Sequence, residues 1–152
     1  MFTGIVQGKF PVVDLVDQSG LRQFALQLSD ELINGLMRGA SVAVSGVCLT
    51  AVRFHENQVG FDVMEETLRK TTLGRLQEGD FVNIERSARM GDEIGGHIMS
   101  GHISTMATIV NIETPENNQV ITLRVEPDWM KYFFSKGFIG LDGASLTVVN
   151  VD

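Results

Sequence analysis

A five-residue pattern occurs twice in this chain and constrains its fold more than any other feature. Gly46–Thr50, read Gly-Val-Cys-Leu-Thr, recurs 97 positions later as Gly143–Thr147, read Gly-Ala-Ser-Leu-Thr. Gly4 and Gly101 stand at the same offset. An offset that holds without a gap along the chain is typical of a duplicated unit, and this one has the length of a small domain. The sequence therefore predicts two copies of one domain, with related loops built twice.

Composition and charge exclude several classes of function. The chain of 152 residues is 43% hydrophobic and 20% charged, which is ordinary for a globular protein. Its net charge of −7 argues against a nucleic-acid backbone or an anionic membrane as a partner. No apolar run approaches the ~18 residues of a spanning helix, and the N-terminus has no signal-peptide pattern. With a single Cys and therefore no internal disulfide, the expected compartment is the cytoplasm.

The first copy has the pattern of many short strands joined by regular turns, which favours a closed barrel over an open sheet. The expected fold class is all-β with short helices. The expected strands are Ile5–Val16, Leu21–Leu28, Ser41–Val44, Cys48–Phe54, Val59–Val63 and Phe81–Arg86. Short helices are expected over Glu31–Met37, capped by Ser29 or Asp30, and over Glu65–Lys70.

The polar, Gly-bearing stretch Ala88–Gly96 predicts a linker, so the expected domains are residues 1–90 and 97–152. The second copy repeats the pattern, with Pro127 placed to begin a helix over Asp128–Ser135. Its expected strands are Ile103–Ile112, Val120–Val125, Phe138–Leu141 and Ser145–Val151.

Position 152 is the counterpart of His55, so the second copy has no equivalents of Val59–Val63 and Phe81–Arg86. We expect either a chain shortened from a longer protein or an incomplete second barrel, which a mass measurement on the native polypeptide distinguishes. The second barrel would also lack its counterpart of Asp62–Thr67.

Cys48 and His102 are the first candidates for chemistry. On position alone, Cys48 is more often a small buried residue on a strand than a functional thiol. Its counterpart is Ser145, so both copies place a small residue with a polar γ atom here, which favours a ligand contact. His102 is the counterpart of Ile5, and an imidazole can serve as acid, base or hydrogen-bond donor.

Other polar residues are weaker candidates. His97 and His102 stand five apart with no further His or Cys nearby, which disfavours a zinc site. Lys136 could simply complement a helix dipole. Ser41, Thr50, Asp62, Thr67 and Thr147 suit a polyhydroxylated ligand, although such residues at strand ends are usually turn formers. The chain has no P-loop, dinucleotide fingerprint or nucleophile elbow.

Several blocks in order make the chain resemble riboflavin synthase of the α-chain type. These blocks are Met1–Val6, Gly46–Thr50, Glu66–Leu68, Gly95–His102 and Lys136–Thr147. The resemblance implies two tandem six-stranded Greek-key β-barrels related by an internal repeat, the second incomplete here. It also implies a cytoplasmic homotrimer, with active sites between subunits and lumazine synthase as a possible associate. One molecule of 6,7-dimethyl-8-ribityllumazine would transfer a four-carbon unit to a second, so that the donor becomes a pyrimidinedione and the acceptor becomes riboflavin, without a cofactor.

The resemblance also assigns substrate-binding residues to each barrel. For the first barrel they are Gly4, Ile5, Val6, Cys48, Leu49, Thr50, Asp62, Val63, Met64, Glu65, Glu66 and Thr67. For the second they are Gly101, His102, Ile103, Lys136, Ser145, Leu146 and Thr147. His102, Cys48 and Ser41 are the candidates for proton handling or nucleophilic assistance. The chemistry needs a proton removed from one 7-methyl group and a nucleophile added to the other ring.

Two other functions stay open at this point. A non-catalytic relative of the lumazine-protein type would bind a lumazine or flavin as a fluorophore. A plain interaction module would use the repeat only as structure, but it would leave the matched polar blocks unexplained. We expect that a chain ending at Asp152 binds lumazine in the first barrel and could fail to turn it over.

Overall fold

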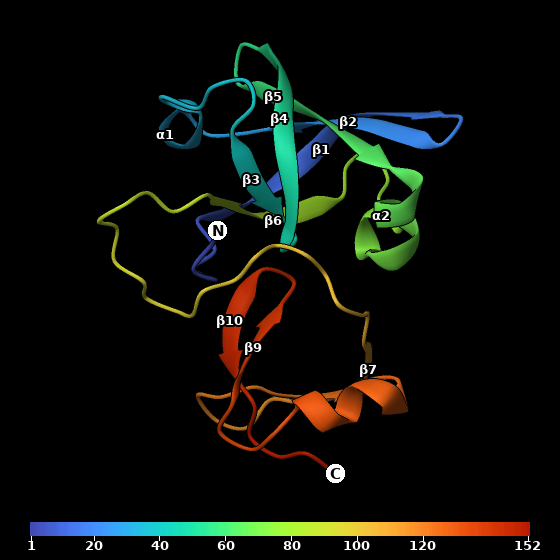
Figure 1. The fold of residues 1–152 in the computed structure, drawn as a ribbon, viewed down its shortest axis with the longest axis vertical. Coiled ribbons are helices and arrows are strands. Elements are labelled where there is room, and N and C mark those ends of the chain that lie inside the picture. Colours follow the sequence, from blue (N-terminus) through green and yellow to red (C-terminus); the bar gives the residue numbers. More distant parts are fainter.

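The computed structural model describes residues 1–152, which form ten strands, two short α-helices and two 3₁₀ helices (Figure 1). The strands are β1 Gly8–Gln18, β2 Leu21–Gln27, β3 Ser41–Val44, β4 Val47–His55, β5 Gln58–Met64, β6 Phe81–Arg86, β7 Thr108–Glu113, β8 Val120–Arg124, β9 Phe138–Leu141 and β10 Ala144–Thr147. The helices are α1 Asp30–Ile33, α2 Glu65–Lys70, η1 Thr72–Arg75 and η2 Pro127–Tyr132.

The first six strands close into one barrel with the neighbour order β1-β2-β5-β4-β3-β6. The chain jumps from β2 to β3 and from β5 to β6, which are connections of the Greek-key kind. Closure leaves no unpaired sheet edge in this half of the chain. The expected six-stranded barrel is therefore confirmed for the first copy.

Alternating apolar residues of the six strands fill the barrel. Phe24 on β2 and Phe61 on β5 pack with ring centroids 5.6 Å apart, among fifteen other buried apolar residues that lie between Val12 and Ile84. Beyond residue 87 only Gly101, Gly137 and Gly143 are buried. The second half of the chain therefore has no core of its own in this structure, and Ile103 packs partly against the core of the first.

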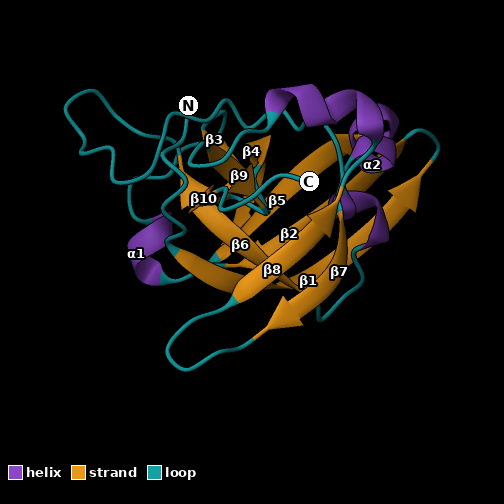
Figure 2. Cartoon of the chain, turned by 90° about the horizontal axis from the view of Figure 1, so that it is seen from below, coloured by secondary structure: helices purple, strands orange, loops and turns teal.

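The second half consists of two separate antiparallel pairs, β7–β8 and β9–β10. Seen from below in Figure 2, they lie in front of the barrel. Their register repeats that of the first half at the 97-residue offset. Ser41 pairs with Thr50 and Phe138 with Thr147, while Val12 pairs with Leu26 and Ile109 with Leu123. This recurrence is consistent with a repeated unit whose second barrel is incomplete.

Several expected bounds need correction. Strand β1 begins at Gly8 and not at Ile5, and β7 begins at Thr108 and not at Ile103. Just before the expected starts, Gly4 and Gly101 accept hydrogen bonds from Ser145 and Cys48 in the opposite half of the chain. Helix α1 ends at Ile33, four residues before the expected end, although Ser29 caps it by accepting from Leu32. The expected helix after Pro127 is a 3₁₀ helix, and β10 ends at Thr147.

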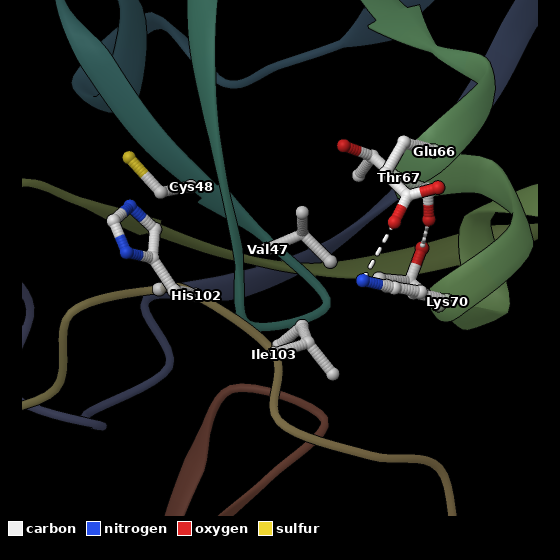
Figure 3. Close-up of a pocket in the computed structure, with 9 residues that line it drawn as sticks. Val47, Cys48, Glu66, Thr67, Lys70, His102 and Ile103 are labelled. Carbon is white, nitrogen blue, oxygen red and sulfur yellow. Dashed lines mark hydrogen bonds and ion pairs between the residues drawn. The ribbon is translucent and has the colours of Figure 1, made fainter.

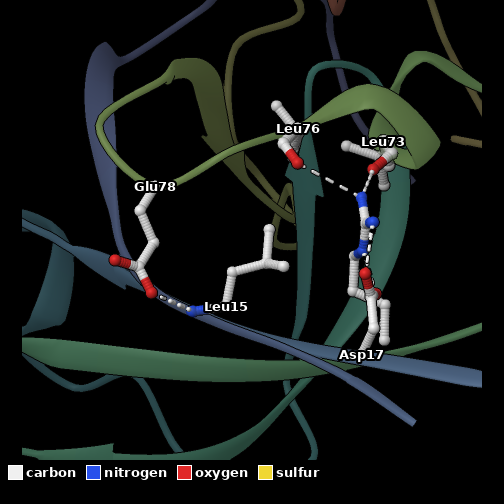
Figure 4. Close-up of polar contacts among 6 residues, drawn as sticks. Leu15, Asp17, Leu73, Leu76 and Glu78 are labelled. Carbon is white, nitrogen blue, oxygen red and sulfur yellow. Dashed lines mark hydrogen bonds and ion pairs between the residues drawn. The ribbon is translucent and has the colours of Figure 1, made fainter.

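Arg22 ties helix η1 to the barrel wall. Its guanidinium donates to the carbonyls of Leu73 and Leu76, at 2.9 and 3.3 Å, and makes two bonds to the Asp17 carboxylate, at 2.6 and 2.9 Å (Figure 4). These bonds hold the pKa of the Asp17 carboxyl below its ordinary value.

None of the helices has the length and apolarity needed to cross a lipid bilayer.

Candidate functional site

Residues 97 positions apart meet in reciprocal pairs where the two halves join. The backbones of Phe2 and Met99, which are counterparts, exchange two hydrogen bonds of 2.9 Å each. The turns at Gly46 and Gly143 touch so closely that a Cβ on Gly46 would stand 2.7 Å from the Gly143 nitrogen. Such self-complementary contacts are those of a two-fold arrangement. The two halves therefore face each other as nearly equivalent partners.

The segment that begins each half, residues 1–7 in the first and 98–104 in the second, is its leading segment. Each leading segment contacts the hairpin of the other half. The Cys48 amide donates to the Gly101 carbonyl at 2.8 Å, and the Ser145 amide donates to the Gly4 carbonyl at 2.9 Å. We call Cys48 with Gly101 and His102 the first cradle, and Ser145 with Gly4 and Ile5 the second cradle. The two cradles are equivalent in backbone geometry but carry different side chains.

A pocket opens at the first cradle. Its lining residues are Val47, Cys48, Glu66, Thr67, Lys70, Thr71, Gly101, His102 and Ile103. In Figure 3 the imidazole of His102 lies beside the free thiol of Cys48, while the α2 side chains Thr67 and Lys70 stand across the pocket. The volume of about 200 Å³ is below the usual range for pockets that enclose a whole ligand. The site would therefore contact one face or one end of a flat ligand.

Glu66 and Lys70 pair across one turn of α2, with 2.6 Å between Oε1 and Nζ. The hydrogen bond from Lys70 is the main cause that lowers the pKa of the Glu66 carboxyl. This exposed pair places both a cation and an anion at the pocket rim. Thr67 and Thr71 are four residues apart, on the same side of the helix end.

The second cradle holds a histidine that the sequence pattern did not place there. His97 Nδ1 lies 2.6 Å from the Ser145 hydroxyl oxygen, and its ring packs on Phe138 with centroids 4.5 Å apart. Gly4 approaches Ser145 so closely that a Cβ there would stand 2.6 Å from the Ser145 Cβ. The γ oxygen of Ser145 is therefore held from several sides.

The buried carboxylate of Glu85 anchors the segment that forms the second cradle. It accepts hydrogen bonds from the Thr3 amide at 2.6 Å, the Thr3 hydroxyl at 2.8 Å and the Gly4 amide at 3.0 Å. Glu85 is only 4% exposed, so these three hydrogen bonds compensate for the hydration that its carboxylate loses on burial. Through Gly4, the β6 strand of the barrel positions the backbone that receives Ser145.

Asp142 and Asn83 form a further link between the halves. The Asn83 amide donates to the carbonyl and to the carboxylate of Asp142, each at 2.9 Å. Loss of hydration beside the barrel raises the pKa of the Asp142 carboxyl above its ordinary 3.8, although a hydrogen bond from Ser45 opposes the rise.

Replacing Asp142 by Asn is expected to change the pH dependence of stability. Because the folded-state pKa is raised, the folded chain holds this proton more tightly than the unfolded chain does. The protonated carboxyl therefore contributes to the free energy of unfolding below pH 3.8, and this contribution is lost as the pH rises through the raised pKa. An asparagine side chain does not titrate, so the free energy of unfolding of Asp142→Asn should increase relative to that of the unsubstituted chain as the pH rises from 3.8 through the raised pKa. Urea unfolding at successive pH values measures this difference. A stability difference that stays constant with pH would contradict this assignment.

The structure groups the expected binding segments differently from the sequence prediction. Gly101, His102 and Ile103 line the pocket with Cys48 and Thr67, whereas Gly4 meets Ser145. The assignment of Gly4–Val6 to the first barrel and Gly101–Ile103 to the second is therefore wrong. The physical reason is the exchange of leading segments between the halves.

Other expected residues lie away from the pocket. Asp62 is held on the barrel exterior by Arg53, at 2.5 Å, and Gln23, at 3.0 Å. Leu49 and Val63 point into the core. Ser41, Thr50, Met64, Glu65, Lys136, Leu146 and Thr147 do not line the pocket either.

Sequence reasoning missed Val47, Lys70 and Thr71 in the pocket, and Glu85 and Asn83 between the halves. The spacing Thr67–Thr71 was the available signal, since side chains four apart share a helix face. For Glu85 no local signal exists, because its partners are more than 80 positions away. No group of three or more His, Cys, Asp or Glu side chains is arranged to hold a metal ion.

The fold combines a closed Greek-key barrel with a pocket between α2 and a second-half segment, and comparison with known proteins gives its class, a lumazine-binding protein. The family model for the lumazine binding domain matches residues 3–87 and 100–152. Riboflavin synthase of Escherichia coli (strain K12) is 51% identical over 152 residues, covering 99% of this chain and 71% of that protein. Riboflavin synthase of Chlamydia pneumoniae is 41% identical over 152 residues, covering 100% of this chain and 74% of that one.

Solved structures agree with this assignment. The crystal structure of LumP complexed with riboflavin has a TM-score of 0.92 and 26% identity, covering 100% of this chain and 82% of that chain. LumP complexed with 6,7-dimethyl-8-(1'-D-ribityl) lumazine has a TM-score of 0.89 and 25% identity, covering 100% and 81%. Together these matches show that the chain belongs to the riboflavin synthase family.

Proposed function

We propose that this chain is a riboflavin synthase, a transferase of riboflavin biosynthesis. It would convert two molecules of 6,7-dimethyl-8-ribityllumazine into riboflavin and 5-amino-6-(ribitylamino)pyrimidinedione by moving a four-carbon unit. The observation that carries the proposal is the reciprocal pair of cradles, in a chain 51% identical to the Escherichia coli riboflavin synthase. A reaction between two copies of one substrate suits two equivalent backbone sites, since positioning two rings together supplies much of the rate.

The first substrate would bind in the pocket between α2 and the segment Gly101–Ile103. Backbone groups of Cys48–Thr50 other than the Cys48 amide, which bonds to Gly101, would read the flat edge of the pyrimidine ring, and Thr67 would take a ribityl hydroxyl. His102 beside Cys48 is the favoured group for moving a proton. Ser41 has weaker support as a catalytic group, because it lies on β3 paired with Thr50 of β4 and does not line the pocket.

The alternative function is that of a non-catalytic fluorescent protein of the lumazine-protein type, which binds a lumazine or flavin as a fluorophore. It is favoured by the TM-score of 0.92 to LumP complexed with riboflavin. The retained blocks Ser100–His102 and Gly143–Thr147 favour the synthase instead.

The domain bounds, the compartment and the oligomeric state are part of the same proposal. The two lumazine-binding units would be residues 1–90 and 97–152, in a cytoplasmic homotrimer able to associate with lumazine synthase. Ile109, Ile112 and Ile121 on β7 and β8 are exposed here. They stand at the positions that Val12, Leu15 and Phe24 occupy in and against the core of the first barrel, so their exposure reflects the incomplete second barrel. Sedimentation equilibrium of the purified chain tests the trimer.

The test of function is to incubate the chain with the ribityllumazine and to follow riboflavin formation together with ligand fluorescence. Turnover supports the synthase, and binding without turnover supports the lumazine-protein type. If neither occurs, the result indicates a structural module or an inactive fragment.

His102→Ala is expected to lower turnover by about 10²-fold, since general acid–base groups contribute at least that much. Cys48→Ser should lower it by about a few fold, because the hydroxyl keeps a polar γ atom there. The matched control is His55→Ala, at an exposed histidine on β4 outside the pocket. Near-full turnover in both His102→Ala and Cys48→Ser would refute the assigned roles.

A further inference from the structure

We propose that His97 is a positioning residue that fixes the hydroxyl of Ser145 in the second cradle, where that hydroxyl contacts the second substrate ring. This inference rests on the proposed function, because it supposes that the second cradle receives a pyrimidinedione edge. His97 acts through Ser145 and needs no contact with the ligand.

His97 is held by two contacts of its ring and one of its backbone. Its Nδ1 lies 2.6 Å from the Ser145 oxygen, its face packs on Phe138 at 4.5 Å, and its backbone amide donates to the Thr3 carbonyl at 2.9 Å. A half-buried ring with this many contacts has little freedom to rotate. The hydrogen bond to Ser145 is therefore built into the fold of the second cradle.

The preceding glycine is shaped for the same contact. A Cβ on Gly96 would stand 2.1 Å from the Thr3 carbonyl oxygen, 2.7 Å from the Ser145 Cβ and 3.0 Å from its hydroxyl oxygen. No side chain fits there without moving the backbone. Gly96 thus lets the backbone pass close to Ser145, and the next residue, His97, reaches the Ser145 hydroxyl.

The bond makes the two cradles chemically unequal. A serine hydroxyl has one donor hydrogen and two acceptor sites, and the bond to Nδ1 commits one of these. When His97 Nδ1 accepts the hydroxyl hydrogen of Ser145, the oxygen lone pairs face the second cradle. When Nδ1 carries a hydrogen and donates it to the oxygen, the hydroxyl hydrogen is free to face the second cradle. Cys48, the counterpart of Ser145, carries a thiol, which is a weaker donor and acceptor. Two identical substrate molecules would therefore meet different partners, as a reaction that makes one the donor and the other the acceptor requires.

The bond is tested first without any ligand, from the ring-nitrogen resonances of the three histidines in long-range ¹H–¹⁵N correlation spectra of the whole chain. Ser145→Ala is expected to shift the His97 Nδ1 resonance and to leave His102 unchanged. Cys48→Ala, at the equivalent position of the first cradle, is the matched control and should leave His97 unchanged. A His97 Nδ1 resonance that is the same with and without the Ser145 hydroxyl overturns the proposal.

The role is tested by a double-mutant cycle on turnover of the ribityllumazine and on its dissociation constant. His97→Phe keeps the ring on Phe138 and removes the bond, and should lower kcat about fivefold with a smaller change in KM. His97→Asn, whose amide stands near the place of Nδ1, should restore at least half of that loss. In the Ser145→Ala background, His97→Phe should have no further effect.

Each outcome decides one question. Additive effects of the two substitutions, or an unchanged kcat and dissociation constant in His97→Phe, overturn the positioning role while the proposed function stands. A chain that neither binds nor converts the ribityllumazine overturns the proposed function, and the spectra still decide the His97–Ser145 bond. Equal urea midpoints of His97→Phe and the unsubstituted chain exclude a purely structural cause.

Discussion

Replacing Gly101 by alanine is expected to lower the free energy of unfolding by about 3 kcal/mol and to disrupt the first cradle. Gly101 has φ +79°, and a Cβ there would stand 2.5 Å from the Cys48 Cβ and 2.9 Å from the Cys48 nitrogen. Neither atom can move without breaking the 2.8 Å hydrogen bond from the Cys48 amide to the Gly101 carbonyl. Lumazine affinity should therefore fall together with stability.

The matched control is Gly91→Ala. Gly91 has φ +95° but no atom within 4 Å of its would-be Cβ. Its substitution adds only the strain of a left-handed backbone, about 1 kcal/mol. Urea unfolding measures both variants, and equal losses would show that close packing against Cys48 contributes nothing.

Replacing Glu85 by alanine is expected to cost about 4 kcal/mol. The substitution leaves the amides of Thr3 and Gly4 and the Thr3 hydroxyl without their acceptor in a buried site. Glu85→Gln keeps one acceptor oxygen but turns an NH₂ toward the remaining donors, so it should cost about 2 kcal/mol. Because Gly4 receives the Ser145 amide, both variants should also loosen the second cradle.

Glu78→Ala is the control for this effect. The Glu78 carboxylate also accepts from a backbone amide, that of Leu15 at 3.2 Å, but on the exposed surface (Figure 4). Water can replace it there, so the loss should stay within about 0.5 kcal/mol. Urea unfolding gives the energies, and hydrogen exchange at the Gly4 amide reports the local opening. If Glu85→Ala lost no more stability than Glu78→Ala, Glu85 would not anchor the N-terminal segment.

Local patterns predicted much of the first barrel. Strands β3 and β6 and helix α2 have the expected bounds, since each is marked by its own apolar pattern and by flanking glycines or polar residues. The bounds of β1 and β7 were wrong at their starts. Residues 5–7 and 103–107 are apolar enough to suggest strands, but they directly follow the junction between the halves, where Gly4 and Gly101 bond to Ser145 and Cys48.

The candidate site was predictable only in part. Cys48, Thr67 and His102 were expected as site residues, and they do line one pocket. Their assignment to separate barrels failed, because the sequence offset shows which segments are alike but not which of the two equivalent hairpins each one contacts. His97 was considered only as a metal ligand, and its contact with Ser145 spans 48 positions.

The sequence by itself determined that this chain builds related hairpins at Gly46–Thr50 and Gly143–Thr147, because turns and alternating strands are local properties of the residues that form them. The tertiary structure decided that each hairpin is completed by the leading segment of the other half. That choice depends on the 2.8 and 2.9 Å bonds between Cys48 and Gly101 and between Ser145 and Gly4, and on glycines that leave no room for a side chain where the backbones meet. Such contacts form only when both halves are folded and docked, so no local pattern could specify them.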